Sequence, residues 1–301
     1  MTLERARGAL LGTFVGDALG MPYEGCRAGT APRPLEMVEA RLGRGTYTDD
    51  SQMMIALAES LLACGRVEPE HLASAFLDAY DPQRGYGSGT VEVLSRWRAG
   101  EPVDAAAERL FGASGGSFGN GAAMRIAPVA VMFASDTERL LHEARASARL
   151  THTHPVGIEA AVAQAAAVGA ALTGGDPLAA PTEALRGGEV EERLAEAAKH
   201  VEDRISPIET AKLLGNSSAG HESVPAAIYS AAAHSGFEEP VTFAIACGGD
   251  TDTIGAMAGA IAGARHGLGA IPTRWLEALE EGDRGRSYVD DLAQRLWECG
   301  S

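Results

Sequence analysis

Apolar residues recur at helical spacing along most of this 301-residue chain, and the alternating pattern of β-strands is almost absent. The chain contains neither a repeat of solenoid length nor a linker-like stretch, so we expect one all-α domain over residues 1–301. The breaks between helices are rich in Gly and Pro, at 43–45, 112–121, 174–181 and 248–249. The periodicity predicts helices at about 4–19, 51–64, 70–80, 88–99, 121–134, 136–150, 155–173, 182–186, 189–204, 222–236, 238–247, 252–266 and 286–298.

Small side chains dominate the predicted helices. The chain has 37 glycines and only 5% aromatic residues. Helices with small side chains can approach each other closely, so we expect tight packing with thin layers of side chains between helices.

The chain carries a formal net charge of −16. An acidic surface repels phosphate backbones, so we expect no direct binding of nucleic acid. A substrate with a pyrophosphate would meet the same repulsion. Metal ions or backbone amides would then have to offset it locally.

The cysteines and the N-terminal segment indicate a cytoplasmic protein. The four cysteines are scattered without a C-x-x-C pair, which argues against a zinc framework or a disulfide scaffold and fits a reducing compartment. The apolar run near the N-terminus contains Glu4 and Asp17 and has helical spacing, so we interpret it as a core helix and not as a signal peptide. We expect no apolar stretch to reach the roughly 18–20 uncharged residues of a membrane span.

Two acidic loops precede long apolar helices, Thr48-Asp49-Asp50 and Gly248-Gly249-Asp250-Thr251-Asp252-Thr253. Carboxylates and hydroxyls are the ligands that hard cations such as Mg²⁺ prefer. Aspartates so close together would repel in a helix-rich interior unless a cation neutralised them. In an extended loop, Asp250 and Asp252 would point the same way and share an ion. The sequence therefore predicts a carboxylate cage, provided that the fold brings the two loops together.

A structural alternative exists for both loops. Asp and Thr are favoured N-cap residues, so Asp50 or Asp252 could simply cap the helix that follows. The spacing alone does not decide between the two interpretations.

The glycine-rich segment Gly115–Gly121 precedes the helix expected from Ala122. Exposed N–H groups at such a helix end can hold a phosphate without a basic side chain. The alternative is an ordinary glycine-rich loop between helices.

Two further places carry candidate polar residues. His152 and His154 stand two residues apart, but imidazole suits zinc or iron better than magnesium, so we expect a histidine that orients substrate or caps a carbonyl. Glu24 lies in a loop after the first helix, where the alternative is an exposed surface carboxylate.

These loops, in this order, resemble the ADP-ribosylglycohydrolase family, also called the dinitrogenase-reductase-activating glycohydrolase family. The matching pieces are GALLGTFVGDALGMPYEG at 8–25, YTDDSQM at 47–53, GSFGNGAAMRIAPVA at 116–130, LTHTHPVG at 150–157 and GGDTDTIGAMAGAIAGARHG at 248–267. The segment LGNSSAGHESVPAAIYSAA at 214–232 looks most like the ADP-ribosyl-serine hydrolase branch, type three of the ADP-ribosylhydrolases.

The resemblance implies a compact orthogonal helical bundle with two Mg²⁺ ions at the mouth of a cleft. One ion would be held by Thr48, Asp49, Asp50 and Asp252. The other would be held by Asp250, Asp252 and Thr253, with Glu24 approaching from a mobile flap. The substrate-binding residues that it implies are Gly116, Ser117, Phe118, Gly119, Asn120 and His152. Relatives often have a tyrosine where this chain has Phe118, so a hydroxyl contact would be missing.

The implied activity is hydrolysis of the O-glycosidic bond between ADP-ribose and protein serine, with ADP-ribose and ADP-ribosylated proteins as partners. We expect the chain to be a monomer. Glu24 is the first candidate for proton transfer, followed by Asp49 and Asp50. The sequence leaves open activity on poly-ADP-ribose and O-acetyl-ADP-ribose. The alternatives are an arginine-linked ADP-ribose hydrolase, a non-catalytic ADP-ribose-binding or structural protein, and a metal-dependent phosphoesterase.

Overall fold

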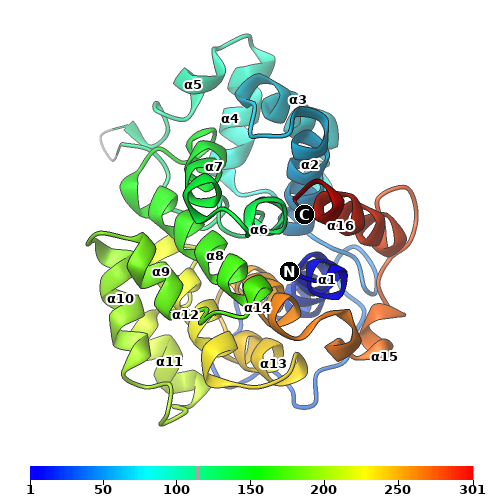
Figure 1. The fold of residues 1–301 in the computed structure, drawn as a ribbon, viewed down its shortest axis with the longest axis vertical. Helices are drawn as coiled ribbons and strands as arrows, with labels where there is room; N and C mark the ends of the chain where they lie inside the picture. Colours follow the sequence, from blue (N-terminus) through cyan, green and yellow to red (C-terminus); the bar gives the residue numbers. More distant parts are fainter. Residues whose placement is uncertain (113–114, 301) are drawn as a thin grey trace.

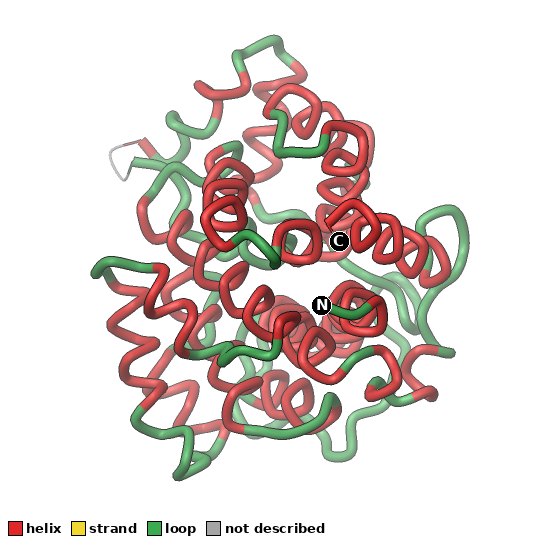
Figure 2. The backbone as a smooth tube through the Cα atoms, viewed as in Figure 1, coloured by secondary structure: helices red, strands yellow, loops and turns green. Residues whose placement is uncertain are grey.

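The computed structural model describes residues 1–112 and 115–300. Residues 113 and 114, inside the predicted break at 112–121, and residue 301, at the end of the predicted domain, lie outside the described residues. The described chain folds into helices joined by loops, without a named strand (Figure 2). Its sheet-like pairing consists of an isolated antiparallel bridge between Gly119 and Ala219. The all-α prediction is therefore confirmed.

The helices alternate between long core elements and short connecting turns. Their bounds are α1 (Leu3–Gly20), η1 (Met21–Tyr23), α2 (Asp49–Cys64), α3 (Pro69–Ala79), η2 (Pro82–Arg84), α4 (Ser88–Arg98), α5 (Val103–Ala106), α6 (Ala127–Phe133), α7 (Thr137–Arg149), α8 (Pro155–Thr173), α9 (Ala179–Ala184), α10 (Glu189–Ala198), α11 (Pro207–Leu214), α12 (Gly220–Ala233), α13 (Glu238–Ala246), α14 (Thr251–His266), η4 (Leu268–Ala270), α15 (Thr273–Leu276) and α16 (Arg286–Gly300).

Two predicted helices are too long. The helix expected over 121–134 begins only at Ala127, because the N–H groups of Ala123 and Met124 both donate to the carbonyl of Asn120 in a turn, and Pro128 starts the helix that follows. The helix expected over 189–204 ends at Ala198, where the N–H of the C-cap Lys199 already donates to the carbonyl three residues back, in the tighter spacing of a terminal turn.

Helices α1 and α14 run antiparallel in direct backbone contact at the centre of the molecule (Figure 1). A Cβ on Gly12 would overlap the carbonyl oxygen of Gly259, and one on Gly16 would overlap that of Gly255. The contact repeats every fourth residue because both helices carry glycine at that spacing. The expectation of close helix packing through small residues is confirmed here. The pairing places the start of α14 beside the end of α1, where both acidic loops are found.

Helix α8 crosses the core beside α14 and α12. It has 19 residues and a mean hydropathy of 1.5, so by length and composition it could cross a membrane. Because it contains Glu159, it does not contradict the expectation that no uncharged stretch reaches the length of a membrane span. Within the described residues it is the one such helix, and 78% of its apolar window is buried inside the fold. We therefore assign it as a core helix.

Candidate metal and substrate site

Asp17, near the end of α1, fixes the start of α2. Its buried carboxylate accepts hydrogen bonds from the N–H of Thr48 (3.0 Å), the N–H of Ser51 (3.0 Å) and the hydroxyl of Ser51 (2.6 Å). Thr48 is the N-cap of α2, and its hydroxyl accepts from the N–H of Asp50 (3.3 Å). Because Thr48 supplies the cap, the carboxylates of Asp49 and Asp50 are not used for capping. The capping alternative is therefore wrong for Asp50.

The second acidic loop is held open by backbone bonds. Gly248 and Gly249 have φ of 70° and 72°, a left-handed conformation that glycine adopts without strain. The N–H of Asp250 donates to the carbonyl of Asn216 (2.9 Å). Asp250 is the N-cap residue of α14 without a side-chain capping bond, and Asp252 already lies in the first helical turn. The expected extended Asp250-Thr251-Asp252 loop is thus wrong, because helix α14 starts at Thr251.

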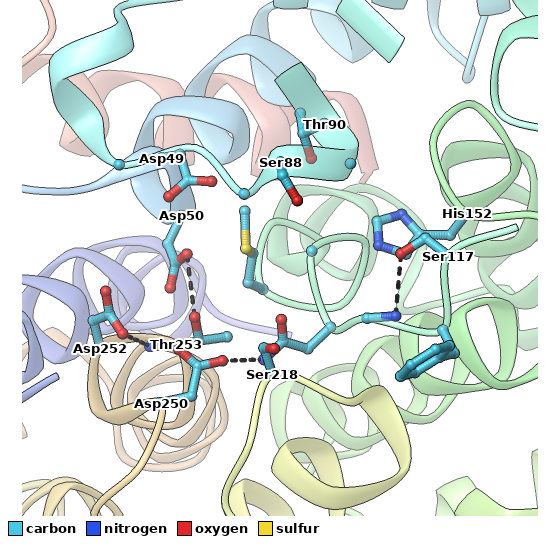
Figure 3. Close-up of a pocket in the computed structure, with 18 of the residues that line it drawn as sticks. Asp49, Asp50, Ser88, Thr90, Ser117, His152, Ser218, Asp250, Asp252 and Thr253 are labelled. Atoms are coloured by element: carbon cyan, nitrogen blue, oxygen red, sulfur yellow. Dashed lines mark hydrogen bonds between the residues drawn. The ribbon is translucent and has the colours of Figure 1, made fainter. Parts of the chain in front are cut away.

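The two acidic loops meet. The hydroxyl of Thr253 donates to Oδ1 of Asp50 (3.4 Å), which joins residues 203 positions apart in the sequence. Figure 3 shows Asp49 and Asp50 on one side of a cavity and the carboxylates of Asp250 and Asp252 on the other. The cavity has a volume of about 500 Å³, which suits a nucleotide-sized ligand. Helix packing therefore brings the two acidic loops together at one cavity, which is the condition that the predicted carboxylate cage requires.

Burial, and then the crowding of several of these carboxylates, opposes their ionisation. Burial, followed by the charge of Asp17, raises the pKa of Asp49 to about 7. Burial raises the pKa of Asp17 itself to about 6. The pKa values of Asp50 and Asp252 lie well above their ordinary range, first because of burial and then because of the neighbouring aspartates. Burial also raises the pKa of Asp250. Charges held together in this way favour the binding of a cation.

The donor set fits a hard cation. Oδ2 of Asp50 is buried without a hydrogen-bond partner, which is costly for a carboxylate unless something positive binds it. Within the described chain, none of Asp49, Asp50, Asp250 and Asp252 pairs with a Lys, Arg or His. The described side chains are not gathered into a closed group of three carboxylate, imidazole or thiolate ligands. The oxygen donors that the cavity offers a cation are these carboxylates and the hydroxyl of Thr253.

The glycine-rich loop forms the opposite wall of the cavity. Its backbone pairs with the start of α12, since the N–H of Asn120 donates to the carbonyl of Ser218 (2.9 Å) and the N–H of Gly220 donates to the carbonyl of Phe118 (2.9 Å). The Asn120 amide donates to Oδ2 of Asp250 (2.6 Å) and so links this wall to the acidic loops. The loop does not open α6 directly, because the turn described above separates them. The expected phosphate cradle at a helix end is therefore wrong in that detail.

The two histidines have different tasks. His152 is buried and lines the cavity, as predicted for a residue that contacts substrate. His154 is the N-cap of α8, where its Nδ1 accepts from the N–H of Val156 (3.2 Å), and its ring lies edge-on to Phe118 with the centroids 6.0 Å apart. It thus caps a helix start and not a carbonyl.

Glu24 follows η1 and lines the cavity with an exposed side chain. Its charge raises the pKa of both Asp49 and Asp252, so it lies near both acidic loops. Backbone bonds join its loop to the start of α14, from the N–H of Gly25 to the carbonyl of Gly249 (2.7 Å) and from the N–H of Gly249 to the carbonyl of Cys26 (2.9 Å). The surface alternative is therefore incomplete, because the exposed carboxylate faces the cavity.

Most predicted site residues share this one cavity. Those that line it are Glu24, Asp49, Asp50, Ser117, Phe118, Gly119, Asn120, His152, Asp250, Asp252 and Thr253. Thr48 and Gly116 lie behind the lining, Thr48 as a buried cap and Gly116 close to Thr153.

Sequence reasoning missed two parts of the site. Asp17 was assigned to a core helix, although a lone acid among small apolar residues was a usable signal. The wall before and at the start of α4 was missed entirely. It contributes Gly85, Gly87, Ser88, Gly89 and Thr90. Alternate glycines directly before a helix could have marked it.

Comparisons with known proteins agree with this geometry. The ADP-ribosylglycohydrolase family model matches residues 1–300. ADP-ribosylhydrolase ARH3 of Danio rerio is 35% identical over 99% of this chain and 91% of the relative, and that of Homo sapiens is 32% identical over 98% and 93%. A solved structure described as an ADP-ribosylglycohydrolase-related protein complex is 34% identical, covers 99% of both chains and gives a TM-score of 0.77. The chain is therefore a hydrolase that belongs to the ADP-ribosylglycohydrolase family.

Proposed function

We propose that this chain hydrolyses the O-glycosidic bond between ADP-ribose and a serine side chain of modified proteins, and that it requires two Mg²⁺ ions. The observation that carries the proposal is the junction of the two acidic loops through Thr253 and Asp50, in a cavity whose far wall is the glycine-rich loop. A cation site beside a backbone-lined wall suits a substrate that carries both a ribose diol and a diphosphate.

The candidate ligands follow from the lining. One ion would be held by Asp49, Asp50 and Asp252, with Thr48 adjacent, and the other by Asp250, Asp252 and Thr253. When bound, the ions would supply Lewis-acid charge that orients the distal ribose hydroxyls and polarises water. Mg²⁺ takes oxygen ligands, which matches a set without thiolate or imidazole.

The remaining chemistry belongs to the chain. Water attacks the anomeric carbon of the distal ribose while the bond from that carbon to the serine oxygen breaks. A proton must reach the departing serine oxygen, and another must leave the attacking water. Glu24 is the proposed proton carrier, because it is exposed at the cavity and lies near both acidic loops. Asp49 and Asp50, which line the same cavity, are the further candidates.

The choice of serine rests on the segment 214–232. Its resemblance to the ADP-ribosyl-serine hydrolase branch covers the end of α11 and most of α12, and this segment forms part of the site. Ser218 lines the cavity, and Ser223 accepts from the Asn120 amide (3.0 Å). The relatives named ADP-ribosylhydrolase ARH3 also align with this chain over nearly its whole length.

The test compares two peptides of one sequence that carry ADP-ribose on serine or on arginine. With Mg²⁺, we expect the chain to release free ADP-ribose and unmodified peptide from the serine-linked form, as measured by mass spectrometry. Asp252→Asn should reduce the rate by roughly 100-fold or more, since it removes the carboxylate shared by both proposed ions. The matched control is Asp283→Asn, which removes an exposed carboxylate outside the cavity lining.

Three results would contradict the proposal. Release from arginine alone would assign the other linkage, and AMP with ribose phosphate would indicate diphosphate cleavage. Full activity of Asp252→Asn would remove the metal assignment.

A further inference from the structure

A fully buried arginine lies behind the cavity without a carboxylate partner. Arg125 follows the glycine-rich loop, is 0% exposed, and forms no ion pair within the described chain. Its guanidinium lies over the Phe76 ring, 4.7 Å from the centroid. Burial lowers its pKa to about 9, which leaves it charged at neutral pH. An unpaired buried charge is costly, so its contacts should indicate what it does.

Arg125 contacts the polypeptide directly before His152. Its Nη2 donates to the carbonyl of Ser147 (3.1 Å) and to the hydroxyl oxygen of Thr151 (2.8 Å). That same hydroxyl lies 2.8 Å from Nδ1 of His152. All three side chains are at least 96% buried, so water does not compete along this path.

The direction of the hydrogen bonds from Arg125 through Thr151 to His152 follows from the donors available. A guanidinium has no acceptor, so the Thr151 oxygen must accept from Arg125. The hydroxyl proton of Thr151 then needs an acceptor, and in the described structure the one within reach is Nδ1 of His152. If Nδ1 carried a proton instead, the buried Thr151 hydroxyl would be left without an acceptor.

We propose that Arg125 and Thr151 are positioning residues that hold His152 as the neutral tautomer with its proton on Nε2, so that it donates a hydrogen bond into the cavity. Nε2 lies on the cavity side of the ring. A Cβ built on Gly121, a residue of the cavity lining, would stand 3.4 Å from it. No protein acceptor is found for Nε2 in the part of the chain described.

The same geometry keeps the ring neutral. Burial, together with the charge of Arg125, lowers the pKa of His152 to about 3. His152 therefore does not transfer protons at neutral pH. It presents a fixed N–H to an acceptor oxygen. The assignment of that oxygen to ADP-ribose rests on the proposed function, whereas the tautomer itself does not. In the other tautomer a lone pair would face the substrate oxygen and repel it.

The first test needs no substrate. Long-range ¹⁵N–¹H NMR of the ¹⁵N-histidine-labelled protein reports which ring nitrogen carries the proton, and His152→Gln assigns the signal. We expect an Nε2–H tautomer that is unchanged between pH 8 and pH 5. A proton on Nδ1, or titration near the ordinary histidine pKa, would overturn the proposal. The tautomer is read from the wild-type spectrum, and His152→Gln serves only to assign the signal.

The second test removes the middle member of the hydrogen-bonded series Arg125–Thr151–His152. Thr151→Val removes the hydroxyl at nearly the same size, and Thr151→Ser restores it. The matched control is Thr210→Val, because Thr210 is equally buried but donates to the backbone carbonyl of Ser206, the N-cap of α11. We expect Thr151→Val to shift the tautomer and to weaken ADP-ribose binding in the presence of Mg²⁺ by roughly tenfold in calorimetry.

Thr151→Ser should retain the wild-type tautomer and affinity, and Thr210→Val should leave both unchanged. An unaltered tautomer and affinity in Thr151→Val would overturn the proposal that Arg125 and Thr151 position His152. If wild-type protein shows the Nε2–H tautomer but does not bind ADP-ribose, the proposed function fails while the tautomer assignment stands.

Discussion

Replacing Gly12 by alanine tests the helix pair that assembles the site. A Cβ at this position would overlap the carbonyl oxygen of Gly259 and stand 3.0 Å from the Phe237 ring. The carbonyl belongs to the backbone of α14 and cannot rotate away, so the two helices would have to separate. Because both helices are almost entirely buried, that separation disturbs packing along their full length.

The expected cost follows from two opposing terms. Overpacking a core costs up to about 3 kcal/mol, and a backbone clash belongs at the upper end of that range. Alanine in place of glycine returns about 1 kcal/mol of helix propensity. We therefore expect Gly12→Ala to lower the free energy of unfolding by about 2 kcal/mol. In a chain of this size that corresponds to a melting temperature lower by roughly 4 °C.

Urea unfolding followed by circular dichroism measures this difference. The matched control is Gly269→Ala, where an added Cβ meets no atom within 4 Å, and we expect a change within about 0.5 kcal/mol. A Gly12→Ala protein as stable as wild type would refute the close pairing of α1 with α14. It would also remove the reason that the acidic loops meet.

Three further outcomes follow from the site. Ser51→Ala should lower the free energy of unfolding by about 2 kcal/mol in urea titration, because it removes a 2.6 Å hydrogen bond to the buried Asp17 carboxylate. A loss below about 0.5 kcal/mol would contradict that bond. Glu24→Gln should lower kcat by roughly 100-fold or more in the serine-peptide assay while ADP-ribose affinity stays within about threefold, and an unchanged kcat would exclude Glu24 as proton carrier. Without divalent cations, thermal unfolding should show stability falling as pH rises from 5 to 8. The reason is that Asp17 and Asp49, with pKa values near 6 and 7, keep their protons in the folded chain. In the unfolded chain an aspartate, with an ordinary pKa of about 3.8, has already lost its proton at these pH values. Mg²⁺ should flatten this slope because it replaces the protons, and a slope of opposite sign would contradict the raised pKa values.

Much of the fold could be predicted because helical periodicity is a local signal. The starts of α4, α8 and α10 agree with the sequence pattern to the residue. Helix α11 was missed, although Ser206 and Glu209 form a capping box that the sequence displays. The start of α6 could not be placed from periodicity, because the apolar pattern continues through the turn at Asn120.

The site was predictable as a set of residues but not as an arrangement. Spacing could not show that the loops at Asp50 and Thr253 touch, because a glycine contact between two helices at opposite ends of the chain brings them together. The role of Asp17 was hidden for the same reason, since its partners lie 31 and 34 residues further along the chain. The resemblance supplied the candidate ligands, and the structure showed which of them line one cavity.

The most direct measurement of the central claim is Mg²⁺ binding by calorimetry in Asp50→Asn, Asp252→Asn and the double variant. If the two loops form one cation site, each single change should weaken binding strongly, and the double variant should lose much less than the sum of the two single losses. Losses that add, or Mg²⁺ binding unaffected by either change, would show that the loops do not share a cation and would contradict the account.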